Sequence, residues 1–168
     1  MAFLRGKKLG DGAVVTNIDE YRRWAVEMDA RMKTMFDRYV RTIVVDVHNT
    51  IVQYSPVGKP ETWKWDPPPG YIPGRFRQNW QITIGTPANA SIDTRGGPPT
   101  GAKGPPQVGL SQVPGDPITP FRRYWITNNV AYGPRLERGY SQQAPRGFVH
   151  LAIGEAKASA GLMSRGIR

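Results

Sequence analysis

The residue types that most often carry chemistry are scarce in this chain, and their spacing matches no familiar site. The 168 residues include no cysteine and two histidines, His48 and His150. Disulfides, thiolate metal sites and a cysteine nucleophile are therefore excluded. Asp46 stands near His48, but two residues apart on a helix point to different faces. Neither histidine belongs to a metal-binding spacing such as H-x-x-x-H. We interpret both as structural or exposed side chains.

The carboxylates and the glycine-rich runs give no catalytic pattern either. Acidic side chains between residues 19 and 46 interleave with arginine and lysine, which indicates a solvated, ion-paired helix face. No run fits the phosphate-binding pattern G-x-x-x-x-G-K-[ST]. Ser141 lacks the Gly-x-Ser-x-Gly elbow of hydrolases. The sequence thus predicts a protein that is not an enzyme, with no catalytic, cofactor-binding or metal-binding residues.

Basic residues next to aromatic ones offer a different chemistry, nucleic-acid binding. The net charge is +10, and residues 121–168 hold eight basic and two acidic side chains. The segments 121–125 and 135–140 place arginine beside Phe, Tyr or Trp, a pattern that suits base stacking and phosphate neutralisation. A strand with one face in a core and arginine at its edge gives the same pattern, and we favour it for Tyr124 and Trp125. Whether the arginines contact DNA or only protect a strand edge stays open. The residues that could face DNA are Arg122, Arg123, Arg135 and Arg138.

The elements that must position these residues begin with a long helix. Apolar residues recur at steps of three and four from Ile18 to Tyr54. Asn17 and Glu20 resemble a capping box at its start, and Pro56 ends the run. A helix over 18–54 is about 55 Å long, more than one compact domain usually needs. It is therefore either broken near residues 42–47 or extended along a neighbouring subunit.

Methionines form part of the apolar stripe of this helix. Met28, Met32 and Met35 follow the helical spacing. Methionine fills irregular gaps in cores and also forms binding surfaces. Between the two, we favour core filling.

Two predicted strands and two long loops follow. Residues 75–86 alternate, with Trp80, Ile82 and Ile84 on one face, and residues 121–130 alternate in the same way. The 19 glycines and 16 prolines concentrate between residues 56 and 120. They predict insertion loops at 58–73 and 86–120, the second with a short strand around 107–113.

The two ends of the chain complete the predicted organisation. Glycines at 6, 10 and 12 indicate a flexible basic arm over residues 1–16. A last helix is expected over 145–160, with Phe148, Val149, Ala152 and Ala156 as its apolar stripe. Gly161 fits a C-cap, before a frayed tail over 161–168. We predict one α+β domain over 17–160, with both helices packed on a small, mainly antiparallel sheet and long Pro/Gly-rich loops.

Four short elements resemble the neck or tail-completion proteins of long-tailed bacteriophages. In chain order they read Ser-Pro-Val at 55–57, Gly-Arg-Phe-Arg-Gln-Asn-Trp at 74–80, Ile-Thr-Asn-Asn-Val-Ala-Tyr-Gly-Pro-Arg-Leu-Glu-Arg-Gly at 126–139, and Gln-Ala-Pro-Arg-Gly-Phe-Val at 143–149. The resemblance covers roughly residues 18–160. The chain departs from the family pattern at 58–73 and at 86–120, where it is longer.

The resemblance implies a structural role in the virion, with assembly in the host cytoplasm and no catalytic residues. It implies a homo-oligomeric ring, hexameric or dodecameric, that contacts other neck, tail-terminator or head-completion proteins and touches DNA non-specifically. No apolar stretch approaches the length of about 20 residues that a membrane span needs, so no membrane partner is expected. The alternative is a basic nucleic-acid-binding protein. The residues expected at the subunit or partner interface are aromatic, or flank the family-like elements: Trp63, Trp65, Tyr71, Arg75, Phe76, Trp80, Tyr132, Leu136, Glu137 and Tyr140.

Overall fold

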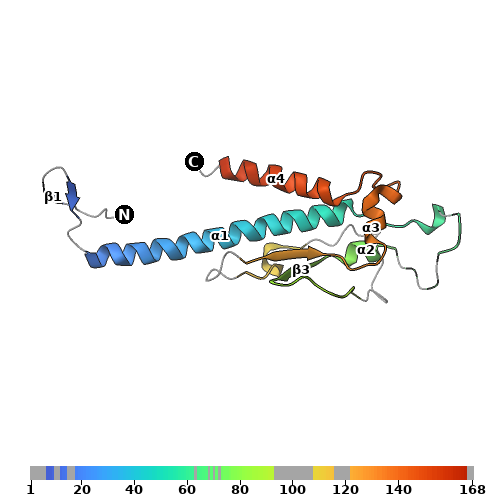
Figure 1. Cartoon of the computed structure of the whole chain (residues 1–168), viewed down its shortest axis with the longest axis horizontal. Helices are drawn as coiled ribbons and strands as arrows, with labels where there is room; N and C mark the ends of the chain where they lie inside the picture. Colours follow the sequence, from blue (N-terminus) through green and yellow to red (C-terminus); the bar gives the residue numbers. More distant parts are fainter. Residues whose placement is uncertain are drawn as a thin grey trace. The chain divides into compact units, whose positions relative to one another are not determined.

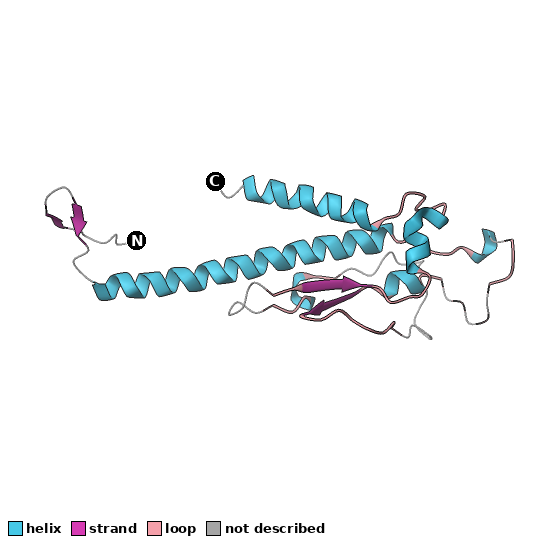
Figure 2. Cartoon of the chain, viewed as in Figure 1, coloured by secondary structure: helices cyan, strands magenta, loops and turns pink. Residues whose placement is uncertain are grey.

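The structure, a computed structural model, describes residues 7–9, 12–14, 18–62, 64–67, 69, 71, 73–92, 108–115 and 122–165 (Figure 1). The chain divides into two compact units, one formed by Met1–Tyr39 with Gly115–Phe121 and the other by Val40–Pro114 with Arg122–Arg168. The predicted α+β class is confirmed, with a long N-terminal helix, a C-terminal helix and a small antiparallel sheet (Figure 2). Among the described residues, no helix combines the length and the apolar character needed to cross a membrane.

Helix α1 (Ile18–Tyr54) has the predicted bounds and contributes to both units. The break considered near residues 42–47 does not occur, because the helix is continuous there. β-branched residues lower helix propensity only slightly. In this stretch Val44 is buried and Val47 packs against the core, so tertiary packing compensates.

The first unit corrects the expectation for the N-terminal arm. Strands β1 (Lys7–Leu9) and β2 (Gly12–Val14) pair antiparallel, with Lys7 opposite Val14. Regular structure is therefore present where the glycines predicted none. A Gly-Asp pair separates the two strands in the sequence, and such a pair favours a tight hairpin as readily as it disfavours a helix.

The second unit contains the other sheet, formed by β3 (Gln81–Ile84) and β4 (Tyr124–Thr127). The strands are antiparallel, and Ile82 lies opposite Ile126. Since alternate residues share a face, the register places the isoleucines and Tyr124 on one face. The predicted alternation of both strands is thereby confirmed.

Part of the first predicted strand is helical instead. Residues Arg75–Gln78 form a single turn, α2, which begins after Gly74 at φ 83°. The Asn79 side chain donates a hydrogen bond to the Arg75 carbonyl at 2.7 Å, and Asn128 donates one to the Phe76 carbonyl at 2.8 Å. These side chains satisfy carbonyls that a strand would have paired, so tertiary contacts override the alternating pattern.

The prediction of a short strand around 107–113 is also wrong for the described residues 108–113. Leu110–Gln112 form a 3₁₀ turn, η3. Two side chains of α1 hold this segment. Asn49 accepts a hydrogen bond from the Val108 amide at 2.9 Å and donates one to its carbonyl at 3.0 Å. The Arg41 guanidinium donates to the carbonyls of Leu110 and Val113, both at 3.3 Å.

The final helix is shifted relative to the prediction. Helix α4 spans Val149–Arg165, so it starts four residues after Pro145 and continues through Gly161. Gly161 is therefore not a C-cap, and residues 161–165 of the predicted frayed tail are helical. The apolar stripe is confirmed, because Phe148, Ala152 and Ala156 are buried.

The core of the second unit joins elements that are far apart in the sequence. It is a cluster in which α1, α2 and α4 meet, formed by Ile51, Phe76, Val130, Ala144, Phe148 and Ala152. Trp80 and Ile126 extend it toward the sheet. In Figure 1, α4 and the paired strands β3 and β4 lie on either side of the C-terminal part of α1. His48 is buried in the same part of α1, which agrees with a structural role.

Candidate functional site

The candidate site is built around the C-terminus of α1, where the chain leaves the helix at Ser55. The last carbonyls of a helix lack intrahelical partners. The Arg77 guanidinium donates to the Ser55 carbonyl at 2.7 Å and to the Gln53 carbonyl at 3.0 Å. The Ser55 hydroxyl in turn accepts a hydrogen bond from the Trp80 indole at 2.8 Å. Partial burial lowers the pKa of Arg77 from its ordinary value, and the cation suits the negative end of the helix dipole.

A second set of hydrogen bonds ties the C-terminal elements to this end. A wide turn, η4 (Leu136–Tyr140), follows one short helical turn, α3 (Gly133–Arg135). The Glu137 carboxylate accepts hydrogen bonds from the amides of Phe148 and Val149 at 2.9 and 3.1 Å. It thereby caps the N-terminus of α4, and this contact sets where that helix begins.

A third contact completes the arrangement. The Gln143 side chain accepts a hydrogen bond from the Val57 amide at 3.2 Å and donates one to the Val57 carbonyl at 2.6 Å. This two-point contact holds the segment after Pro56 as a neighbouring strand would. All four sequence elements of the family-like pattern are therefore joined by hydrogen bonds within one unit.

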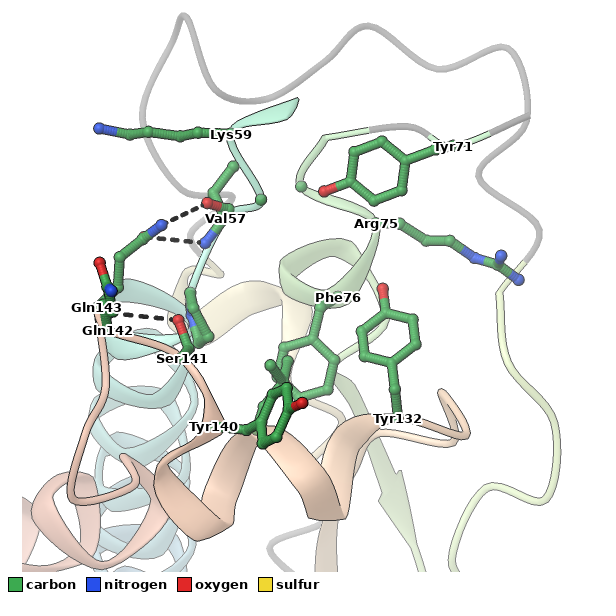
Figure 3. A pocket seen from close by; sticks show the side chains of 14 residues that line it. Val57, Lys59, Tyr71, Arg75, Phe76, Tyr132, Tyr140, Ser141, Gln142 and Gln143 are labelled. Atoms are coloured by element: carbon green, nitrogen blue, oxygen red, sulfur yellow. Dashed lines mark hydrogen bonds between the residues drawn. The ribbon is translucent and has the colours of Figure 1, made fainter. Parts of the chain in front are cut away.

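Between these elements lies a groove of about 750 Å³ (Figure 3). Val57 lies on one side of it, and Tyr71 and Tyr132 lie on the other, with Phe76 and Tyr140 below. Two short turns contribute to its lining, α2 through Arg75 and Phe76 and η4 through Leu136 and Tyr140. The turn η1 (Pro60–Thr62) follows Lys59 in the loop. The volume is typical of a binding site.

The floor of the groove is rigid because aromatic rings pack beneath it. The Phe76 ring contacts Trp80 and Phe148 edge-to-face, with centroids 5.8 and 5.6 Å apart, and it lies 5.9 Å from the ring of Tyr132. Such geometry stabilises aromatic pairs beyond simple burial. Gly133 approaches Phe76 so closely that an added Cβ would lie 3.1 Å from its ring.

The electrostatics of the groove are set by two cations and three phenols. Lys59 and Arg75 flank it on opposite sides, with their charged ends directed outward (Figure 3). Burial raises the pKa of Tyr132, and the positive charge of Arg75 opposes that rise. Burial also raises the pKa of Tyr71, as do the neighbouring Tyr132 and Glu61. Both phenols are therefore neutral hydroxyls near neutral pH.

The structure brings together most of the predicted interface residues. Six of them line the groove: Tyr71, Arg75, Phe76, Tyr132, Leu136 and Tyr140. Trp80 lies behind the groove and packs against the core. Glu137 caps α4 and is not part of the groove lining. Trp65 is not part of the groove lining and is 76% exposed, with the Lys64 ammonium 5.6 Å from its ring centroid. Trp63 lies outside the described residues.

The four arginines proposed to face DNA are all exposed. The guanidinium carbon of Arg135 lies 3.6 Å from the centroid of the Tyr140 ring, so the two groups stack. The guanidinium carbon of Arg123 lies 5.9 Å from the centroid of the Trp125 ring. Arg122 and Arg123 precede β4, whereas Arg135 and Arg138 belong to α3 and η4. Within the described residues, no group of three or more His, Asp or Glu side chains could hold a metal ion.

The methionine stripe of α1, which the sequence assigned to the core, is a second candidate surface. The assignment is wrong for Met32 and Met35, whereas Met28 is half-buried. In the part of α1 that belongs to the first unit, Met32 and Met35 are 49% and 62% exposed, and Trp24 is 50% exposed. The helical periodicity correctly grouped the methionines on one side, but it did not include Trp24. Periodicity alone does not tell whether that side packs within the chain or against another one.

No protein-family model matches the chain, and neither a curated protein nor a solved structure is significantly similar to it.

Proposed function

We propose that this chain is a structural protein of the neck or tail of a long-tailed bacteriophage. In this role, copies of the chain associate with one another and with other virion proteins to complete the tail or join it to the head. The proposal includes no catalytic step, and it gives DNA at most a non-specific contact.

The observation that carries the proposal is the exposed apolar stripe of α1. At about 100° per residue, six of the seven large exposed apolar residues of α1 fall within one side about 120° wide, and Val26 lies outside it. We call this side the α1 stripe; it comprises Ile18, Tyr21, Trp24, Met32, Met35 and Phe36. A contiguous apolar surface of this kind marks a protein-interaction site.

A second copy of this chain fits the α1 stripe by charge. The same helix carries charged side chains of both signs, which form ion pairs. Arg22 lies 3.8 Å from Asp19, and Lys33 lies 2.7 Å from Asp29. Because charges of both signs lie on this helix, a second copy meets no uniform like-charge surface there. A contact between two different faces of the same chain, repeated around an axis, closes into a ring.

The family-like elements give separate support to the bacteriophage part of the proposal. Their resemblance to the neck proteins was read from four short stretches of sequence. In the fold these stretches interlock through Arg77, Asn128, Glu137 and Gln143. The four stretches thus belong to one structural framework, as expected if they form a single family pattern.

The native mass of the purified full chain, measured by light scattering over a concentration series, tests the self-association. We expect a discrete oligomer for the wild type and a monomer for the double variant Trp24→Glu, Met35→Glu. The matched control is Ala30→Glu, an exposed position on the opposite side of the same helix. Equal oligomers for all three proteins, or a monomeric wild type, would count against the α1 stripe as the contact.

Nucleic-acid binding is the second candidate, and the Arg135–Tyr140 stack favours it. A guanidinium stacked on an exposed ring is a feature of single-strand binding surfaces. Titration of labelled DNA with the chain at several salt concentrations tests it. Tight binding that weakens with salt, and that is lost in an Arg135→Glu, Arg138→Glu variant, would favour this candidate over the structural role.

A further inference from the structure

The groove between Val57 and Tyr132 is a different surface from the α1 stripe, and its chemistry points to a different occupant. The two surfaces belong to different units of the chain. We infer that the groove binds an extended segment of a different protein, in which a bulky apolar side chain stands between acidic residues. This goes beyond self-association, and it does not depend on the oligomeric state.

The apolar part of the inference comes from the walls and the floor. Val57, Leu136 and the edge of Phe76 supply apolar surface, and the tyrosines supply ring faces. The floor is fixed by the edge-to-face contacts of Phe76 and by the hold of Gln143 on Val57. A preformed aromatic cavity loses little entropy when a side chain enters it.

The size of the occupant follows from the exposed rim. Tyr140 is 70% exposed, and Tyr132 is also exposed. A small molecule in the cavity would leave most of the Tyr140 ring in water, whereas a protein segment running across the groove covers it. Tyrosine and arginine are also the side chains that contribute most to binding at protein interfaces.

The acidic part of the inference comes from charge. The lining includes two cations, Lys59 and Arg75, and no carboxylate. Arg135 adds a third positive charge beside the Tyr140 ring. Glu61 acts on Tyr71 from nearby, so the surroundings remain net positive. The Tyr132 hydroxyl can donate a hydrogen bond to a carboxylate or carbonyl oxygen of the occupant.

Charge also argues against a second copy as the occupant. The whole chain carries a net charge of +10. Residues 1–17 include Arg5, Lys7 and Lys8 against a single Asp11, and the last residues include Arg165 and Arg168. Both ends of a second copy would therefore be repelled by the groove, and an acidic segment of another protein would be attracted.

A nucleic acid fits less well, although it is also anionic and stacks on aromatic rings. A single-strand site combines a basic track along the backbone with exposed ring faces. Here the charged ends of Lys59 and Arg75 point outward on opposite sides, and Phe76 is buried (Figure 3). The arrangement suits a protein segment that inserts one apolar side chain into the groove and places a carboxylate near each of the two cations.

The test uses fluorescence anisotropy with the full chain and labelled synthetic peptides. The probe peptide has a Phe-Pro-Leu centre flanked by aspartates, and its partner has the same centre flanked by lysines. We expect the aspartate peptide to bind at least about tenfold more tightly than the lysine peptide.

The variants Tyr140→Ala and Arg75→Glu test the groove itself. We expect each of them to weaken binding of the aspartate peptide at least about tenfold. Both replaced side chains are exposed, so the fold should tolerate the changes. The control Arg146→Glu alters an exposed arginine outside the groove lining and should bind like the wild type.

Four results would overturn the inference. The aspartate peptide could fail to bind, or the groove variants could bind it as tightly as the control variant does. The chain could also prefer the lysine peptide, or oligothymidine could displace the aspartate peptide. Displacement by a peptide of this chain's own residues 1–17 would instead make a second copy the occupant. None of these results depends on whether the α1 stripe self-associates.

Discussion

At the scale of single residues, Arg77 connects the end of the long helix to the rest of its unit. Its two hydrogen bonds to the carbonyls of Ser55 and Gln53 satisfy groups that the helix itself cannot pair. The structure assigns Arg77 to the cap of α1, and Arg75 to the groove.

Arg77→Met should destabilise the fold by about 1–3 kcal/mol, because it leaves the carbonyl of the buried Ser55 without its donor. Arg77→Lys should lose less, since an ammonium keeps the charge but not the two-point geometry. Urea unfolding of the full chain measures both. Arg146→Met, at an exposed position, is the matched control, and an Arg77→Met protein as stable as this control would contradict the capping role.

His48 should make the stability pH-dependent. Burial lowers its pKa below the ordinary value of about 6.5, although hydrogen bonds to the Asn49 side chain and the Trp80 backbone oppose this. The unfolded chain therefore binds a proton that the folded chain excludes. The contribution of neutral His48 is fully present above pH about 6.5 and falls below it, by at most about 1.4 kcal/mol per pH unit. Urea midpoints between pH 8 and pH 5, on the wild type and on His48→Gln, measure this. A variant with the wild-type pH slope would exclude His48 as the cause.

At the scale of elements, the start of α4 depends on a residue in the preceding turn. Glu137 caps the helix through two amides, and Gly147, at φ 78°, lets the chain pass close to it. An added Cβ on Gly147 would lie 2.4 Å from the Glu137 carbonyl oxygen. The boundary of α4 is therefore a tertiary feature and not a local one.

Glu137→Ala should destabilise the fold by about 1–2 kcal/mol, the usual effect of losing an N-cap. The amides of Phe148 and Val149 should then exchange hydrogen faster, because they lose their acceptor. Glu137→Gln keeps one acceptor oxygen and should show a smaller effect. Amide exchange followed by NMR gives the readout, and unchanged exchange in Glu137→Ala would show that the cap contributes nothing.

The elements that the sequence predicted well are those held by local periodicity. Helix α1 follows from a spacing repeated over its 37 residues, and β3 and β4 follow from a short alternation of apolar and polar residues. Helix α2, turn η3 and the start of α4 could not be predicted, because side chains distant in the sequence (Asn128, Asn49 and Glu137) decide them. The groove itself was not predicted, although its three tyrosines were named as interface residues. Gln143 and Val57 were missed as a pair because a single amide contact leaves no periodic signal.

At the scale of the whole molecule, the net charge of +10 gives opposite salt dependences to the two functions considered. Copies that associate through an apolar stripe must overcome their mutual repulsion, which salt screens. Binding to nucleic acid instead releases counterions and weakens as salt rises. Salt therefore separates the two functions without any knowledge of the natural partner.

Self-association of the full chain should strengthen as salt rises from low to physiological concentration. The oligomer should then persist to lower protein concentration in a light-scattering dilution series. The Ala30→Glu control should follow the wild type, whereas Trp24→Glu, Met35→Glu should stay monomeric at every salt concentration. An association that weakened with salt would instead assign the contact between copies to exchanged ion pairs such as those of Arg22 and Lys33. The apolar side chains of the α1 stripe would then need another partner.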